Sequence, residues 1–328
     1  MKAAVYTRYG PPDVVQITDV EKPVPQDNEV LIKVHAASVN PVDWHLMRGL
    51  PYFVRLAAGL PNPKIARLGA DVAGQVEAAG RNVAQFKPGD EVFGCCRGSF
   101  AEYACAPESR LALKPESVTF EQAACAGVAA LTALQAFRDK GHLQPGERVL
   151  INVAAGGVGT FAVQIAKAFG AEVTGVCSSG NVEMVRSLGA DRVIDYTQEN
   201  FTTSGQRYHL ILDCIGNHSL SACKRVLTSE GRCIAVGGPG GKWMLGSLAS
   251  AILSPMLSRL SSRKLIVFLA RINQADLTYL GELMASRKVT PVIDRRYPLS
   301  ELPGAIRYLE TGHARGKVVI ALDSAITT

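Results

Sequence analysis

The fold of this chain is decided by the stretch VLINVAAGGVGTFAVQIAKAFG, residues 149–170. It begins with a short apolar run typical of a buried strand and continues through a turn of small residues that carries three glycines. It ends in a run with the periodicity of a helix. A strand, a glycine-rich turn and a helix in this order are the setting in which a dinucleotide pyrophosphate binds at a helix N-terminus. The stretch therefore predicts a Rossmann-type α/β domain.

The glycines of the turn have separate roles in this interpretation. Gly156 permits the tight turn, the backbone amides of Gly157 and Val158 approach the pyrophosphate, and Gly159 lets the helix pack closely on the strand. A turn that serves packing alone is the alternative. The sequence that follows favours nucleotide binding, because a second strand (171–178) and further strand and helix pairs come after the helix.

Strands and helices alternate from residue 119 to residue 270. Most of these strands are apolar runs without polar alternation, which is typical of a parallel sheet covered on both faces, and the last is KLIVFLA (264–270). Residues 1–115 instead contain short β-type runs separated by turns. We therefore expect a β-rich domain made of residues 1–119 and 273–328, with a doubly wound α/β dinucleotide-binding domain of residues 120–272 inserted in it.

Composition excludes several classes of protein. The chain has 328 residues, of which 47% are hydrophobic and 20% are charged, as in a soluble globular protein of two domains. Its 35 lysines and arginines and 29 acidic residues give a net charge of +6. The lysines and arginines are dispersed along the chain, so we expect no dedicated binding of nucleic acid. The uncharged run 243–258 contains Pro255 and is shorter than the roughly 20 apolar residues of a transmembrane helix. We therefore expect no transmembrane segment.

The expected compartment is the cytosol. The first residues resemble a strand and not a secretory signal, and the eight cysteines are scattered without disulfide or zinc-finger spacing. The apolar run 264–270 is a long strand at the edge of the predicted sheet, which favours a homodimer in which it pairs with its copy. The role of residues 242–263 stays open between a substrate lid, a dimer contact and a membrane-surface segment.

The end of the second strand indicates which dinucleotide binds. NAD-binding folds usually place an acidic residue there to accept from the ribose hydroxyls. This chain has none, and reads Cys177, Ser178, Ser179, Gly180 and Asn181. Hydroxyl, amide and backbone donors suit the 2′-phosphate of NADPH, which a carboxylate would repel, and Arg186 and Tyr196 are placed to help. The alternative for the serines is helix capping.

Beyond the glycine turn, several motifs resemble those of the medium-chain dehydrogenase/reductase family, in the zinc-independent branch of quinone oxidoreductases, zeta-crystallin and the alkenal/enone oxidoreductases. The resemblance covers essentially the whole chain. It rests on AASVNPVDW (36–44), GADVAGQVEAAG (69–80), KPGDEVFG (87–94), GVAALTALQAF (127–137), SLGADRVIDY (187–196) and HARGKVV (313–319). It implies a GroES-like catalytic domain interrupted by a Rossmann domain, with the active site in the cleft between them.

The resemblance also shows where the chain departs from the zinc-containing members. Asn40 stands in place of their first catalytic cysteine, Ala70 and Asp71 in place of a histidine and glutamate pair, and Val128 in place of a second cysteine. Thiolates and imidazoles are the ligands that hold zinc, so we expect no metal site. Asp71 is then expected to be a structural hydrogen-bond acceptor.

The loss of zinc ligands bears on the reaction. A metal is one standard way to stabilise the localised oxyanion of a ketone under reduction, whereas a quinone or an α,β-unsaturated carbonyl spreads that charge. The implied function is an NADPH-dependent reductase of quinones, enals or enones. The alternatives are an enoyl-thioester reductase and a non-enzymatic NADPH-binding sensor or structural protein.

The candidate site residues follow from the motifs and the resemblance. The catalytic candidates are Asn40, Asp43, Tyr52 and Thr132, with Tyr52 and Phe53 as substrate contacts; Asp43 is as well explained by a structural turn, and Thr132 by packing. The candidate cofactor-binding residues are Asn40, Thr132, Gly156, Gly157, Val158, Gly159, Cys177, Ser178, Ser179, Asn181, Tyr196, Cys214, Ile215, Gly237, Gly238 and Leu269.

Overall fold

The computed structural model describes residues 1–52, 54–64, 67–236 and 264–322. The chain forms two compact units, one of residues 1–131 with 271–328 and one of residues 132–270. The second unit begins after the predicted start at residue 120, because α3 (Phe120–Ala124) packs against β3, β4 and β5 of the first unit. The first unit ends at Leu131 and the second begins at Thr132, so the boundary between the units lies within α4 (Val128–Gln135).

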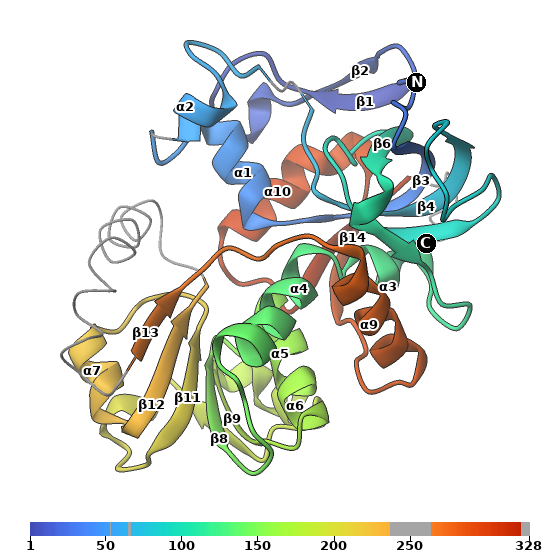
Figure 1. Ribbon diagram of the computed structural model, residues 1–328. Coiled ribbons are helices and arrows are strands. Elements are labelled where there is room, and N and C mark those ends of the chain that lie inside the picture. The colour runs from blue at the N-terminus through green and yellow to red at the C-terminus, as the bar shows by residue number, and fades with distance from the viewer. Residues whose placement is uncertain (53, 65–66, 237–263, 323–328) are drawn as a thin grey trace. The chain divides into compact units, whose positions relative to one another are not determined.

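The second unit is built on a six-stranded parallel sheet in the order β10-β9-β8-β11-β12-β13 (Figure 1). Its strands are β8 (Arg148–Asn152), β9 (Glu172–Cys177), β10 (Arg192–Asp195), β11 (Tyr208–Asp213), β12 (Leu227–Ala235) and β13 (Lys264–Val267). Of its helices, α5 (Gly157–Ala168) packs on β8 and β9, α6 (Val182–Ser187) on β10, and α7 (Leu220–Arg225) on β12. The predicted doubly wound parallel sheet is confirmed.

The last strand is shorter than predicted. The apolar run continues to residue 270, but β13 ends at Val267, which lies opposite Ala235 at the end of β12. Residues 268–270 follow the end of β13 without strand structure, and Leu269 is 91% exposed. An apolar run in the sequence can be longer than the strand it contains, because a strand extends only as far as it has a hydrogen-bonding neighbour.

The first unit contains a seven-stranded sheet in the order β14-β15-β3-β4-β5-β7, with β6 also paired to β3, and a small sheet of β1 and β2. Its strands are β1 (Lys2–Val5), β2 (Gln16–Asp19), β3 (Glu29–Val39), β4 (Asp71–Ala79), β5 (Glu91–Cys95), β6 (Tyr103–Pro107), β7 (Leu111–Leu113), β14 (Ile293–Pro298) and β15 (Lys317–Ala321). Its other helices are α1 (Pro41–Arg48), α2 (Val54–Ala58), α9 (Gln274–Ala285) and α10 (Leu302–Glu310).

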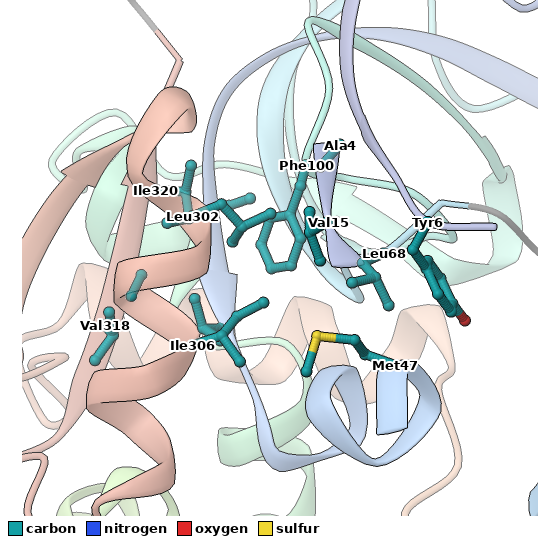
Figure 2. Packing of buried hydrophobic residues seen from close by; sticks show 13 residues of the cluster. Ala4, Tyr6, Val15, Met47, Leu68, Phe100, Leu302, Ile306, Val318 and Ile320 are labelled. Atoms are coloured by element: carbon teal, nitrogen blue, oxygen red, sulfur yellow. The ribbon is translucent and has the colours of Figure 1, made fainter. Parts of the chain in front are cut away.

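A hydrophobic cluster joins the two ends of the chain within the first unit. Figure 2 shows Phe100 among Val15, Leu302 and Ile306, with Met47 of α1 beside them. These five side chains come from both ends of the sequence and are all at least 94% buried. Residues 271–328 are therefore part of the same domain as residues 1–131, which explains how the α/β unit is inserted between them.

Candidate functional site

The glycine turn lies at the N-terminus of α5, directly after β8. Gly156 is the extended N-cap residue, and Gly157, Val158 and Gly159 form the first turn of this 12-residue helix. The amides of a first helical turn have no carbonyl partner within the helix, so they are available to an anion. The turn also leaves no room for a side chain at Gly159, because a Cβ there would lie 2.0 Å from the carbonyl oxygen of Val153. These residues fit a bound pyrophosphate.

The turn sits where the strand order of the sheet reverses, between β8 and β11. Ligands of such sheets bind outside the carboxyl ends of the strands at this point. Asn152, the last residue of β8, donates from Nδ2 to Oδ1 of Asp213, the last residue of β11, at 3.0 Å. That oxygen also accepts the backbone N–H groups of Ile215 and Gly216, at 3.2 and 2.9 Å.

The buried pair Asn152 and Asp213 shapes the loop that carries Cys214 and Ile215, two of the predicted cofactor contacts. Neither residue of the pair is among the predicted site residues. The sequence feature that could have identified it is a polar residue at the end of each of two otherwise apolar strands. Burial of these two polar side chains costs free energy unless they bond each other. The structure brings them together and leaves Cys214 and Ile215 half-buried at the sheet edge.

The predicted ribose-binding residues lie together at the carboxyl ends of β9 and β10. The two strands are parallel, with Asp195 opposite Cys177, and the backbone N–H of Tyr196 donates to the Cys177 carbonyl at 3.0 Å. Asn181 Nδ2 donates to Ser178 Oγ at 3.0 Å. The Tyr196 side chain is 61% exposed. The expectation that Tyr196 lies beside the end of the second strand is therefore confirmed.

An acidic residue, however, stands next to these hydroxyls. Ser179 Oγ donates to Asp195 Oδ2 at 2.6 Å, and Thr197 and Gln198 donate to the same carboxylate. The hydrogen bond from Ser179 lowers the pKa of Asp195 below its usual value, so this carboxylate is ionised at neutral pH. The second strand ends without an acid, as the sequence shows, but the neighbouring strand supplies one.

In the first unit, Asn40 and Asp43 form the N-terminus of α1. Asp43 Oδ2 accepts the backbone N–H of Asn40 at 2.7 Å, and Oδ1 accepts the N–H of Gly69 at 3.2 Å. Asp43 is 1% exposed. Burial raises the pKa of Asp43 to about 7, although the two N–H donors and Lys317 oppose this shift. These contacts support the structural alternative for Asp43, which links the start of α1 to the residues before β4.

A buried polar network surrounds Asn40. Its Nδ2 donates to Asp71 Oδ2 at 2.8 Å and to the Ser38 carbonyl at 3.2 Å, and its Oδ1 accepts from Lys317 Nζ at 2.6 Å. Asp71 Oδ2 also accepts from Ser38 Oγ at 2.6 Å, and Oδ1 accepts the N–H of Val128 at 2.7 Å. Asp71 is therefore the hydrogen-bond acceptor that the sequence predicted.

The side chain of Asn40 is already bonded within the protein. The amide is 2% exposed, and each of its N–H donors and its oxygen already has a partner in this network. The amide would have to leave Asp71 or Ser38 to donate to an acceptor oxygen, which would leave a buried polar group unsatisfied. The network therefore favours a role for Asn40 in shaping its loop.

The remaining predicted residues have different positions. Thr132 is buried in α4 and belongs to the second unit, and Leu269 follows β13. Tyr52 is 72% exposed, and the Arg55 guanidinium lies 4.9 Å from its ring centroid. Phe53, Gly237 and Gly238, as well as residues 242–263, lie outside the described residues. Among the described residues, no helix has the length and apolar character needed to cross a membrane.

Comparisons with known proteins cover both units. A family model described as "Alcohol dehydrogenase GroES-like domain" matches residues 26–116, and one described as "Zinc-binding dehydrogenase" matches residues 188–320. The protein named chloroplast envelope quinone oxidoreductase homolog, from Arabidopsis thaliana, is 34% identical over 98% of each chain. The chloroplastic NADPH-dependent alkenal/one oxidoreductase of the same plant is 35% identical over 98% of this chain and 79% of its own length.

Solved structures agree with these relatives. The quinone oxidoreductase from Coxiella burnetii has a TM-score of 0.86 and 32% identity, covering 98% of this chain and 99% of that one. The quinone oxidoreductase of Escherichia coli, solved as a complex with NADPH, has a TM-score of 0.81 and 25% identity over 98% of this chain and 100% of its own. Each comparison spans the first unit and the inserted second unit together.

Proposed function

Because the chain belongs to the medium-chain dehydrogenase/reductase family, in the branch of the quinone and alkenal oxidoreductases, we propose that it reduces quinones or α,β-unsaturated carbonyl compounds with NADPH. One observation carries this proposal. The chain keeps a complete dinucleotide turn at the N-terminus of α5, while Asn40 stands in place of a zinc-binding cysteine and Asp71 in place of the acid of the histidine and glutamate pair, and both accept hydrogen bonds from Lys317.

Different residues of the second unit bind different parts of the cofactor. The amides of Gly157 to Gly159 hold the pyrophosphate at the N-terminus of α5, and Ser178, Ser179 and Asn181 hold the adenosine ribose and its 2′-phosphate. The loop after Asp213 lies at the neighbouring edge, where the nicotinamide half extends. When bound, the reduced nicotinamide supplies a hydride equivalent to the acceptor.

The acceptor must carry much of the developing charge itself. A conjugated carbonyl or a quinone delocalises the negative charge that arrives with hydride, so orientation and a few hydrogen-bond donors suffice. We propose that the acceptor lies near the loop of Asn40 and Asp43, with the exposed Tyr52 as a substrate contact. For an enone, the β-carbon receives hydride and solvent supplies the proton to the enolate.

Steady-state oxidation of NADPH with a panel of acceptors tests this function. We expect turnover with small quinones, enals or enones, little oxidation of simple alcohols, and the same rates after treatment with a chelator. The reason is that no step uses a metal-bound oxygen. Turnover confined to enoyl thioesters would replace this assignment with an enoyl-thioester reductase, and binding of NADPH without any turnover would leave a binding protein. Alcohol oxidation that chelation abolishes would contradict the mechanism.

We also propose that the protein is a homodimer in a reducing compartment such as the cytosol. Among the strands that the structure describes, β13 is the last in the order of the six-stranded sheet, and an apolar strand in this position favours pairing with a second copy. All eight cysteines are free, as in a reducing compartment. Light scattering at micromolar protein is expected to give twice the chain mass, and a clean monomer mass would contradict the dimer.

A further inference from the structure

Val153, the residue that joins β8 to the glycine turn, has a left-handed backbone. Its φ is +68°, a value that β-branched residues avoid because their Cβ then crowds the following carbonyl oxygen. In the described part of the chain, His142 and Arg287 are the other non-glycine residues with positive φ, and neither is β-branched. A backbone strained in this way persists only where the surrounding structure enforces it.

The residues on both sides of Val153 are held by the sheet. Asn152 lies between Val176 of β9 and Asp213 of β11 in the strand register. The N–H of Ala154 donates to the Val176 carbonyl at 2.9 Å. The chain must therefore turn away from β8 between two fixed residues, and Val153 is the residue that makes the turn.

The carbonyl of Val153 faces the first turn of α5. It accepts the N–H of Gly156 at 3.1 Å, and it is the oxygen that would lie 2.0 Å from a Cβ at Gly159. The amides of this first turn are the proposed pyrophosphate ligands. The conformation of Val153 therefore sets where these amides lie relative to the sheet.

The side chain of Asn152 ties the end of β8 to the loop that follows β11. Its Nδ2 donates to Asp213 Oδ1 at 3.0 Å and to Asn217 Oδ1 at 2.9 Å, so both N–H donors of the amide are used. Asn152 and Asp213 are 3% and 5% exposed. Separating them would leave buried polar groups unsatisfied, so the pair resists displacement.

Asp213 uses the same oxygen to hold residues 214–217. Oδ1 accepts the N–H groups of Ile215 and Gly216 as well as the Asn152 amide, and Gly216 also has a φ of +68°. This loop lies at the sheet edge proposed for the nicotinamide half of the cofactor. The buried pair of Asn152 and Asp213, which we call the Asn–Asp clamp, is therefore bonded to one part of the proposed cofactor site and continuous in sequence with the other.

We infer that the Asn–Asp clamp holds Val153 in its left-handed conformation and so positions the glycine turn and residues 214–217 for one cofactor molecule. The part of this inference that concerns the cofactor rests on the proposed function. Asn152, Val153 and Asp213 are positioning residues, because they act through the amides and the loop that they place. Without the clamp, Val153 relaxes to an ordinary φ, the amides of α5 shift, and cofactor binding has to restore the strain.

The melting order of two variants tests the strain at Val153. Glycine adopts a positive φ freely and alanine does not, so Val153→Gly is expected to melt about 2–4 °C above Val153→Ala. Val193 is the matched control, because it is a half-buried valine of β10 in the same unit. There the order is expected to reverse, with Val193→Ala melting above Val193→Gly. Val153→Ala melting at or above Val153→Gly would overturn the inference.

Removal of the clamp tests whether it enforces this strain. Asn152→Leu keeps a side chain of similar size and loses both N–H donors. In this background we expect the difference in melting temperature between Val153→Gly and Val153→Ala to fall to less than about half, because the valine site can relax. Gln164→Leu removes a buried amide of α5 and is expected to keep the full difference. An unchanged difference in Asn152→Leu would show that the clamp does not enforce the strain.

Fluorescence titration with NADPH, below the melting transition, tests positioning. Asn152→Leu is expected to bind NADPH on the order of 10-fold more weakly than wild type, because binding must restore the strained turn. Gln164→Leu is expected to stay within about twofold of wild type. Val153→Gly added to Asn152→Leu is expected to recover at least about a third of the loss on a logarithmic scale, because glycine adopts the left-handed conformation without strain.

The rescue separates positioning from general stabilisation. If Asn152 only stabilises the fold, folded Asn152→Leu protein will bind NADPH like wild type, or the added glycine will not restore binding, and the positioning role fails. Wild-type protein that binds no NADPH would refute the proposed function. The two melting experiments use no cofactor, so they would still test the clamp.

Discussion

Replacing Gly159 with alanine is expected to weaken NADPH binding on the order of 100-fold and to destabilise the second unit by about 3 kcal/mol. The new Cβ would lie 2.0 Å from the Val153 carbonyl oxygen and 2.8 Å from two backbone atoms of Ala154. Backbone atoms cannot move aside as the end of a flexible side chain does. The helix must therefore shift away from β8, and its amides leave the position in which they hold the pyrophosphate.

Two further glycine variants control this experiment. At Gly304 in α10 no atom lies within 4 Å of a built Cβ, so Gly304→Ala is expected to raise stability by about 0.5–1 kcal/mol and leave NADPH binding unchanged. At Gly156 the nearest atom is a side-chain carbon of Val153 at 3.0 Å, so Gly156→Ala is expected to fold and to bind NADPH more weakly than wild type. Fluorescence titration gives the dissociation constants and thermal unfolding the stabilities. Wild-type binding by a folded Gly159→Ala protein would contradict the pyrophosphate assignment.

Replacing Ser178 with aspartate is expected to weaken NADPH binding by about 10- to 100-fold while NADH binding changes little, because only NADPH carries a 2′-phosphate for the new carboxylate to repel. The wild-type protein is expected to bind NADPH at least about 10-fold more tightly than NADH. Dissociation constants for both reduced cofactors measure this preference. Equal affinity for the two in wild type would remove the argument for NADPH.

Asp195 gives the cofactor preference a second test. Its ionised carboxylate lies beside Ser179 and is already occupied by donors from Ser179, Thr197 and Gln198. If the carboxylate only orders these hydroxyls, Asp195→Asn will leave NADH binding unchanged and, by removing a negative charge, will tighten NADPH binding a few-fold. A large loss of NADH affinity would instead identify Asp195 as the ribose acceptor of an NAD enzyme. Ser221→Asp, at an exposed position of α7 in the same unit, controls for added charge.

Local sequence was enough to predict the strand, turn and helix of the expected dinucleotide site. The apolar run of β8, the glycines and the helical period of α5 are consecutive in the chain, so their structure depends on neighbours that the sequence shows directly. The alternation of strands and helices then predicted the parallel sheet, because such connections build one topology in nearly all cases. The length of β13 was wrong, since only its pairing with β12 shows where it ends.

The sequence could not place side chains that meet from distant segments. Asp195 reaches Ser179 only because β10 and β9 are adjacent, and the absence of an acid after the second strand therefore did not reveal the carboxylate beside the predicted ribose-binding residues. The sequence likewise did not show that the Asn40 amide is bonded to Asp71 and Lys317. Whether a polar side chain is free or already satisfied depends on partners that only the fold brings within 3 Å.

The sequence by itself determined the class of fold, the glycine turn and the substitution of zinc ligands, because each is written in adjacent residues or in a residue type at one position. Only the tertiary structure decided which partners satisfy the buried polar groups of Asn40 and Asp71. Lys317 is 277 residues from Asn40, and it becomes its neighbour because β15 pairs with β3 in a register that sets Val318 opposite Val39. A shift of that register by one residue would turn the ammonium to the other face of the sheet and leave the Asp71 carboxylate buried without its cation.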